Sequence, residues 1–351
     1  MGGSATKPSS TRRPLVSIVV PNYNGKGVLL DCLRSLHRLR LAPRKYEIIV
    51  VDNGSTDGSK ELLARKFKSV RLISLKTNAG FASAINLGVK SSRGQYVALV
   101  NNDVEVTRDW LLQLLLALRK DTRIAVVTGK LLFKNKPRIV NDLGGIILVS
   151  GVGFQRGLGD SDRHIRRRKL VGVPSGAACL IRKADFLDVG GFDDSYFAYF
   201  EDVDLGWRLW QRGRGVAFIP SAVAYHQWRV TAQKLGDQFR TYHGSKNSFA
   251  NLTKNAQRRY IPEAAVLWTL RSSMQILPPL ATPESALGTL KGLAWCARNL
   301  RPLLAERRVI QPDRKVTDTE LMELGVLGGL REFLSEARRL RALSPPVAGF
   351  T

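Results

Sequence analysis

The chain has 351 residues, 44% of them hydrophobic, and its 55 Lys and Arg residues outnumber its 29 Asp and Glu residues, giving a formal net charge of +26. This length suits one large domain with an appendage, or two domains, and the positive excess favours phosphate-rich partners: nucleotides, nucleic acids, anionic lipids or lipid diphosphates. The wide spacing of its three cysteines excludes a disulfide framework, which favours a reducing compartment, and no apolar run reaches the roughly 18 residues of a membrane-spanning helix.

The N-terminal half alternates between strand-like and helix-like segments. Residues 1–13 are polar and basic, so we expect a disordered arm there. Apolar runs predict strands, and apolar residues at helical spacing predict helices. The expected strands are 16–21, 46–51, 70–75, 95–100 and 124–128, and the expected helices are 28–39, 59–67, 79–90 and 110–118. This alternation predicts a mostly parallel sheet with helices on both faces.

The helical period is lost over 141–159, where glycines are frequent, so we expect hairpins or a long loop. A basic cluster follows. It is either a solvated loop or a contact for a phosphate-bearing acceptor or an anionic membrane. The cluster consists of Arg163, Arg166, Arg167, Arg168 and Lys169. Beyond it we expect a strand over 171–181, a helix over 202–212 and a last strand over 216–219.

The composition shifts after about residue 227 towards Leu, Ala and Arg. We therefore expect a main domain over 14–228 and a helical C-terminal region over 229–351. Apolar and cationic positions mix over 260–277 and 287–304. Such amphipathic helices lie on a membrane surface or pack on the main domain, and the sequence leaves both possibilities open.

Polar residues follow four of the expected strands. They occupy 21–24, 52–57, 78–81 and 101–103, with Asn86 farther along the helix that follows the third group. In an open parallel sheet, ligands bind at the carboxyl ends of the strands, so we expect these groups to meet along one edge. Their acids and amides suit a base and a ribose, and a carboxylate there suits a metal ion on a diphosphate.

Three acids, Glu201, Asp202 and Asp204, lie in one expected first helical turn beside aromatic residues. Acids at this position often serve only the helix dipole. Aromatic neighbours and partial burial would instead tune one carboxylate to act as a base. His226 follows the last expected strand, and a lone histidine is more often structural than a ligand.

Together these motifs resemble the inverting nucleotide-sugar glycosyltransferases of family 2, which have the GT-A fold, and most of all their rhamnosyltransferase-like branch. The resemblance covers about residues 15–228 and implies an α/β fold in which a mostly parallel sheet is flanked by helices, with a C-terminal helical extension. The segments that carry it are SIVVPNYNG (17–25), VVDNGSTDGS (50–59), NAGFASAINLG (78–88), LVNNDVEV (99–106), PSGAACLIRKADFLDVGGFDDSYFAYFEDVDLGWRL (174–209) and VAYHQ (223–227).

The resemblance implies roles on the donor side. Asp52 is expected to bind the base or ribose of the donor, inside a nucleotide-sugar site. The other residues expected in that site are Pro21, Asn22, Tyr23, Asn24, Asn53, Asn78, Gly80, Asn86, Asn102 and Asp103.

The resemblance also implies the reacting groups. Asp103 and His226 are expected to hold a divalent cation, Mg²⁺ or Mn²⁺, although Asn101 replaces the first acid of the usual Asp-x-Asp motif. Asp202 is expected to be the general base. The residues expected to border the acceptor are Gly176, Glu201 and Trp207.

The expected reaction moves a sugar from dTDP-rhamnose or a UDP-sugar to a hydroxyl of a glycan or of a lipid-diphosphate-linked acceptor, with inversion at the anomeric carbon. We expect a cytoplasmic protein, peripheral on the cytoplasmic membrane face. Two alternatives are a nucleotidyltransferase and a catalytically silent nucleotide-sugar-binding protein. A nucleic-acid partner is not expected, because the basic residues are scattered and no recognition motif is present.

Overall fold

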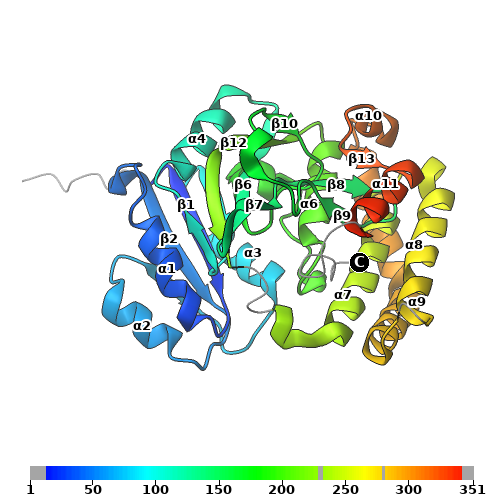
Figure 1. Cartoon of the computed structure of the whole chain (residues 1–351), viewed down its shortest axis with the longest axis horizontal. Coiled ribbons are helices and arrows are strands. Elements are labelled where there is room, and N and C mark those ends of the chain that lie inside the picture. Colours follow the sequence, from blue (N-terminus) through cyan, green and yellow to red (C-terminus); the bar gives the residue numbers. More distant parts are fainter. Residues whose placement is uncertain (1–12, 228–231, 279–280, 342–351) are drawn as a thin grey trace, which may run out of the picture.

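The computed structural model describes residues 13–227, 232–278 and 281–341. A central mixed sheet runs in the order β10-β12-β6-β11-β4-β1-β2-β3, with β5 on β12 and β7 on β6 (Figure 1). These strands are β1 (Val16–Asn22), β2 (Tyr46–Asp52), β3 (Arg71–Ser74), β4 (Tyr96–Val100), β5 (Val104–Val106), β6 (Ile124–Phe133), β7 (Lys136–Asp142), β10 (Lys169–Leu170), β11 (Ala178–Arg182) and β12 (Gly215–His226).

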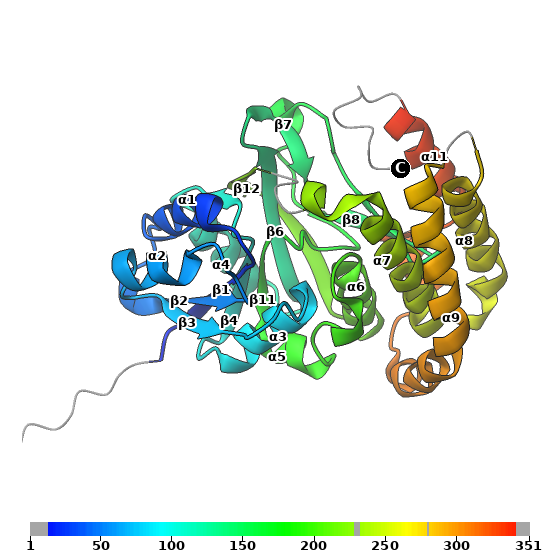
Figure 2. The same ribbon diagram turned by 90° about the horizontal axis from the view of Figure 1, so that it is seen from below.

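Helices cover both faces of this sheet, as predicted, and Figure 2 shows α1 and α2 on one side and α3 and α5 on the other. Because strand side chains alternate between faces, Ile18 and Val20 pack with α1 and α4, whereas Val19 packs with α3 and α6. The helices of the main domain are α1 (Lys26–Leu36), α2 (Ser59–Lys66), α3 (Phe81–Ser91), α4 (Trp110–Lys120), α5 (Lys183–Asp188) and α6 (Glu201–Gln211).

The parallel core of the sheet confirms the predicted arrangement of the first strands. β1 pairs in parallel with both β2 and β4, and β2 pairs in parallel with β3. Their carboxyl ends therefore share one edge of the sheet, where the polar groups were expected to meet.

The second half of the sheet departs from the sequence-based prediction. The strand expected over 171–181 is limited to β11, which runs antiparallel to β4 and β6. The strand expected over 216–219 is only part of β12, and the strand expected over 124–128 continues to Phe133. Both strands are longer than predicted because they pair with each other beyond a register shift between Ile219 and Val223.

The segment 141–159 contains a hairpin, as predicted. β8 (Gly145–Leu148) and β9 (Gly153–Gln155) are antiparallel, and β13 (Leu327–Gly328) pairs in parallel with β8. A strand from the far C-terminal part of the chain therefore completes this small sheet.

The C-terminal region is helical, as predicted, and its helices stack beside α6 and the small sheet (Figures 1 and 2). Its elements are α7 (Ala232–Asn255), α8 (Ile261–Ile276), α9 (Pro283–Ile310), α10 (Asp318–Glu323) and α11 (Leu330–Arg341). Within the described ranges, no helix has both the length and the apolar character needed to span a membrane. The N-terminal arm up to residue 12 and the expected boundary at 228/229 lie outside the described residues.

Candidate functional site

The donor edge of the sheet begins with the paired ends of β1 and β2, where Asn22 lies opposite Asp52. Asp52 is fully buried, and its Oδ1 accepts a hydrogen bond from Asn22 Nδ2 at 3.1 Å. Ser55 closes the group, because its backbone N–H donates to Asp52 Oδ2 and its Oγ accepts from Asn22 Nδ2. The carboxylate is thus held in one orientation at the edge of the sheet formed by the carboxyl ends of β1 and β2.

The turn after β1 is tied to the turn after β2. Asn24 has a φ of 47°, a left-handed conformation that asparagine tolerates better than most residues. Its backbone N–H donates to Ser55 Oγ, and its Oδ1 accepts from the Thr56 N–H. Pro21 and Tyr23 flank this turn and are half-buried. Residues 21–24 therefore lie against the turn that follows Asp52.

Two amides join the ends of β2 and α3. Asn53 Nδ2 donates to Asn78 Oδ1 at 2.8 Å and to the Gly80 carbonyl at 2.9 Å. Gly80 has a φ of +89°, and a Cβ there would lie 2.7 Å from the Phe197 backbone. Glycine is needed at this position both for its conformation and for the close approach of the chain.

Asn102 and Asn86 lie at different depths. Asn102 Nδ2 donates to Asn22 Oδ1 at 2.8 Å, which places it on the donor edge with Asp52. Asn86 faces the segment that precedes α6, where its amide bonds the Phe192 backbone and Asp194. Asn86 therefore holds that segment in place and lies behind the strand edge.

Asp103 and His226, the two residues expected to hold a cation, lie next to each other. The antiparallel pairing of β5 and β12 aligns His226 with Val104, and Asp103 Oδ1 lies 3.2 Å from His226 Nε2. Asn141 Oδ1 accepts a hydrogen bond from His226 Nδ1 at 2.8 Å. With the proton on Nδ1, the lone pair of Nε2 points towards Asp103, the orientation that a metal-binding imidazole needs.

A divalent cation fits these two residues as a two-ligand protein site. Two adjacent ligands of an octahedral ion, each about 2.1 Å from it, lie about 3.0 Å apart, close to the observed separation. Within the described ranges, no group of three or more His, Cys, Asp and Glu gathers for a metal ion. The remaining ligands would therefore come from water or from a bound diphosphate.

Glu201 and Asp202 begin α6. Burial, together with the charge of Asp202, raises the pKa of Glu201, and Glu201 Oε2 is buried without a hydrogen-bond partner. Burial first, and then the charge of Asp142, raises the pKa of Asp202. A Cβ on Gly176 would lie 3.1 Å from Asp202 Oδ2, so Gly176 leaves open the space in front of this carboxylate.

Asp142 is a site residue that the sequence reasoning missed. It ends β7 directly after Asn141, the partner of His226. Burial raises its pKa to about 6, and its charge acts on both Asp202 and His226. Asp142 therefore interacts through its charge both with Asp202 at the start of α6 and with His226, the neighbour of Asp103. A polar pair, Asn141-Asp142, at the start of the glycine-rich segment was the available signal.

The segment before Glu201 has an unusual backbone. Phe197, Tyr199 and Phe200 have φ values of 59°, 72° and 64°. Left-handed conformations in bulky residues are costly and persist only when the surroundings enforce them. Sites of this kind cluster where function requires a fixed geometry.

Helix α7 enforces this conformation. Asn247 Nδ2 donates to three backbone carbonyls of the segment, those of Tyr196, Ala198 and Tyr199. Asn251 Nδ2 donates to the Phe200 carbonyl at 3.3 Å. These contacts could not be predicted from the sequence, because Asn247 and Tyr196 are 51 residues apart in the chain.

Trp207 is the predicted acceptor residue that does not reach this region. It is fully buried, and its indole N–H donates to Asp318 Oδ1 at 3.2 Å. The side chain packs α6 against α10. The structure therefore gives Trp207 a packing role between α6 and α10.

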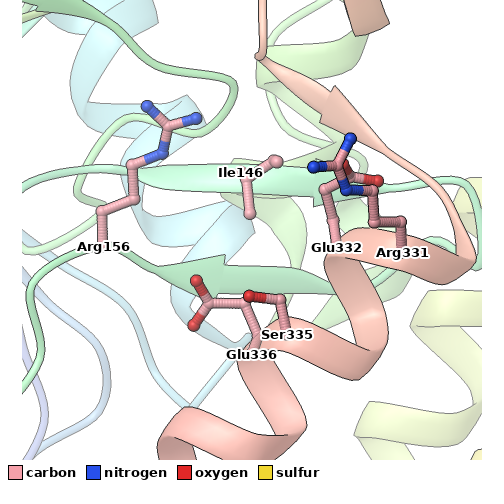
Figure 3. A pocket seen from close by; sticks show the side chains of 6 residues that line it. All are labelled: Ile146, Arg156, Arg331, Glu332, Ser335 and Glu336. Carbon is pink, nitrogen blue, oxygen red and sulfur yellow. The ribbon is translucent and has the colours of Figure 1, made fainter.

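A cavity of about 420 Å³ lies elsewhere, between the small sheet and α11 (Figure 3). Arg156 lines one side of it, and Arg331, Glu332 and Glu336 project from the helix. None of the residues expected in the donor, acceptor or metal site lines this cavity. The mixture of charges and the separate location set it apart from the acids of the sheet edge.

Comparison with known proteins tests the resemblance. The family model described as glycosyl transferase family 2 matches residues 17–190. The chain is 30% identical over 279 residues to an N-acetylglucosaminyl-diphospho-decaprenol L-rhamnosyltransferase of Mycobacterium tuberculosis, covering 72% of this chain and 89% of the relative. The chain belongs to glycosyl transferase family 2. This family-2 protein is therefore an enzyme, a glycosyltransferase, as the sequence motifs predicted.

Another relative of this family-2 protein is a poly-beta-1,6-N-acetyl-D-glucosamine synthase of Staphylococcus aureus. It is 26% identical over 223 residues, which span 63% of this chain and 51% of the synthase.

Two solved structures share the fold. One is a mannosyltransferase from Pyrobaculum calidifontis in complex with GDP-Man and Mn²⁺, with a TM-score of 0.53 and 18% identity, covering 88% of this chain and 84% of the other. The second is GalNAc-T7 with UDP, GalNAc and Mn²⁺, with a TM-score of 0.58 and 19% identity, covering 83% and 59%. These likenesses confirm the GT-A fold predicted for the family-2 domain.

Proposed function

We propose that this glycosyltransferase moves a sugar from a nucleoside-diphosphate donor to a hydroxyl group of a lipid-diphosphate-linked glycan, with inversion at the anomeric carbon. dTDP-rhamnose is the first donor to test, followed by UDP-sugars. The observation that carries the proposal is the 30% identity to a rhamnosyltransferase whose name gives a sugar on a diphospho-decaprenol, together with the acids gathered near Asp202.

The donor edge supports nucleotide binding. Asp52, oriented by Asn22 and Ser55, offers a fixed acceptor for the N–H or O–H groups of a base or ribose. Asn53, Asn78 and Gly80 hold the adjoining turn, so little has to be reorganised when the nucleotide binds. Such preorganisation lowers the entropic cost of binding.

Asp103 and His226 are the proposed ligands of Mg²⁺ or Mn²⁺ in this site. When bound, the ion supplies positive charge that stabilises the leaving diphosphate. The oxygen ligand suits both ions, and the imidazole favours Mn²⁺. Both solved neighbours are complexes with Mn²⁺. This supports a divalent cation without identifying the ion for this chain.

Asp202 is the proposed general base. Its ionised form takes the proton of the acceptor hydroxyl as that oxygen bonds to the anomeric carbon and the bond to the diphosphate breaks. A raised pKa makes the carboxylate a better proton acceptor while leaving it ionised at neutral to alkaline pH. A well-placed base of this kind contributes a factor of about 10²–10⁴ to the rate.

The C-terminal helices support a peripheral position on the cytoplasmic face of a membrane. Several large apolar side chains on α8 and just after it are exposed, including Val266 at 59%, Leu270 at 50% and Leu277 at 58%. Lys291 and Arg298 are exposed on the following helix. This combination of apolar and cationic side chains suits an anionic lipid surface, where a lipid-linked acceptor would be found.

The test is a transfer assay with purified enzyme, Mn²⁺ and a lipid-diphosphate-linked N-acetylglucosamine, offering dTDP-rhamnose and UDP-sugars in parallel. We expect one donor to give a product with inverted anomeric configuration. Slow release of free sugar from the same donor without acceptor separates a transferase from a nucleotidyltransferase or a silent binding protein. Retained configuration, or no turnover of any donor, would contradict the proposal.

A further inference from the structure

Arg271 on α8 forms no ion pair with any of the described residues. Its Nη1 is buried and has no hydrogen-bond partner. Its contact is with an aromatic ring, since the guanidinium carbon lies 5.9 Å from the centre of the Phe200 ring. Burial and the nearby charge of Arg240 lower the pKa of Arg271 to about 10, while no acid is among the causes.

The rest of the chain supplies no carboxylate side chain for Arg271. Among the described residues, none forms an ion pair with it, and the segments outside the described ranges contain no Asp or Glu. The Arg271 side chain is partly exposed, but its Nη1 is shut off from water, and a buried guanidinium nitrogen in a purely structural arginine is normally paired. The unmatched charge is explained if its partner is a ligand.

The space around Arg271 is kept open by a glycine. A Cβ on Gly244 of α7 would lie 3.3 Å from Arg271 Nη2 and 3.9 Å from Phe200 Cε2. Helices α7 and α8 and the strained segment before α6 therefore meet at this point. Phe200, whose ring contacts the guanidinium, immediately precedes Glu201 and Asp202, so Arg271 lies against the segment that leads into the first turn of α6.

Other polar groups along α7 share this surface. Arg240 contributes the second positive charge near Arg271 and is partly held by Asp237, 2.9 Å away. His243 is stacked on Phe197 with ring centres 5.5 Å apart. A region that combines two guanidinium groups with partly buried aromatic rings suits an anion attached to a sugar or a lipid.

We propose that Arg271, assisted by Arg240, binds a phosphate group of the acceptor, so that the acceptor's diphosphate is held beside the base. This inference rests on the proposed lipid-diphosphate acceptor. A guanidinium group matches phosphate oxygens with two parallel hydrogen bonds, which a lysine cannot reproduce. The acceptor sugar would then lie between this anion site and Asp202.

The first test needs no sugar transfer. Because removing an unpaired buried charge relieves an unfavourable interaction, Arg271→Met is expected to unfold at the same temperature as the wild type or at a higher one. Inorganic pyrophosphate binding is measured by calorimetry in an Asp103→Ala background, which weakens the donor site. We expect Arg271→Met to weaken this binding about tenfold or more.

Arg259→Met is the matched control, because Arg259 is an exposed arginine just ahead of α8 that stacks on Tyr260. It should leave pyrophosphate binding unchanged. Equal pyrophosphate affinity in Arg271→Met and wild type would overturn the inference. So would a clear loss of thermal stability in Arg271→Met, since that would reveal a structural role.

The second test uses steady-state kinetics with two acceptors that carry the same sugar, one on a lipid diphosphate and one on an uncharged alkyl chain. For Arg271→Met we expect KM for the charged acceptor to rise about tenfold or more, with KM for the donor and for the uncharged acceptor unchanged. Arg271→Lys should rescue only part of the loss. A rise in KM that is the same for both acceptors would contradict a phosphate contact.

The two tests also separate this inference from the proposed function. If no donor gives transfer to a lipid-linked acceptor but pyrophosphate binding still depends on Arg271, the proposed reaction fails and the anion site stands. If transfer proceeds and Arg271→Met behaves as wild type in both tests, the anion site fails and the reaction stands.

Discussion

The proposed donor edge and the proposed acceptor side of this enzyme satisfy their buried polar groups in opposite ways. On the donor edge, Asn22, Asp52 and Asn53 all have partners within neighbouring turns, and only the Asn101 Oδ1 atom of that edge is buried without one in the described structure. On the acceptor side, buried unpartnered atoms recur along the described segments. They include Glu201 Oε2, His243 Nδ1, Asn247 Oδ1 and Arg271 Nη1.

The difference indicates which side is complete before its ligand arrives. Each buried polar atom without a partner costs about 1–3 kcal/mol, so a folded protein keeps few of them unless they are used. The donor edge is therefore preorganised. The acceptor side retains unmet hydrogen-bonding capacity next to the acid that we propose as the base, and the following experiments test that contrast.

The largest effect is expected from Asp202→Asn. Because the amide cannot take the proton of the acceptor hydroxyl, transfer should fall by about 10²–10⁴-fold. Nucleotide affinity should stay unchanged, since Asp202 lies on the acceptor side. Product formation and nucleotide binding are measured side by side, and near-normal turnover would remove Asp202 from the mechanism.

Breaking the clamp on the strained segment should have the next largest effect. Asn247→Ala removes the side-chain donor shared by three carbonyls of that segment, and of these the Tyr196 carbonyl keeps a bond from the Ala198 N–H. We expect kcat to fall about 10²-fold through misplacement of Asp202, with KM for the donor almost unchanged. Asn299→Ala is the control, because Asn299 bonds only a carbonyl within its own helix. A rise in donor KM without loss of kcat would argue against positioning of the base.

On the donor side, Asp103→Ala should reduce nucleotide affinity about 10–100-fold in the presence of Mn²⁺ and have little effect in its absence. The measurement is a titration of nucleotide by calorimetry with and without Mn²⁺. Asp109→Ala, an exposed acid paired with Arg40, is the control. The same loss in both conditions would mean that Asp103 acts without a metal ion.

The smallest effect is a change in pH dependence. Because the charge of Asp142 helps to raise the pKa of Asp202, Asp142→Asn should lower that pKa. The ionised base would then persist to lower pH, so the acidic limb of the kcat profile should move to lower pH. Asp109→Asn should leave the limb in place, and a shift to higher pH for Asp142→Asn would show the opposite coupling.

The same contrast explains what the sequence could predict. Asp52, Asn53 and Asn78 follow strands whose order is readable from alternating patterns, so their meeting at one edge could be predicted. Asp103 and His226 could be paired only through the family resemblance. Their contact depends on β5 and β12 aligning across the sheet, and the full length of β12 was not predicted.

The contacts on the acceptor side were predicted less well from the sequence, because they join residues that are far apart in the chain. Asn247 and Arg271 belong to helices whose amphipathic pattern does not identify which neighbour they contact. Trp207 was assigned to the acceptor by resemblance. In the structure its buried indole donates to Asp318, which lies 111 residues further along the chain. Asp142 was missed because its segment was predicted only as hairpins or a loop.

Strand β13 has a consequence for how the enzyme is made. It pairs with β8, the strand that begins three residues after Asp142. During synthesis, the donor edge can form once about the first third of the chain has left the ribosome, because domains fold as their segments emerge. The small sheet beside the proposed base is complete only after Leu327 and Gly328 have been synthesised. A truncated product would therefore be expected to retain the donor edge while lacking the structure needed to use the donor productively.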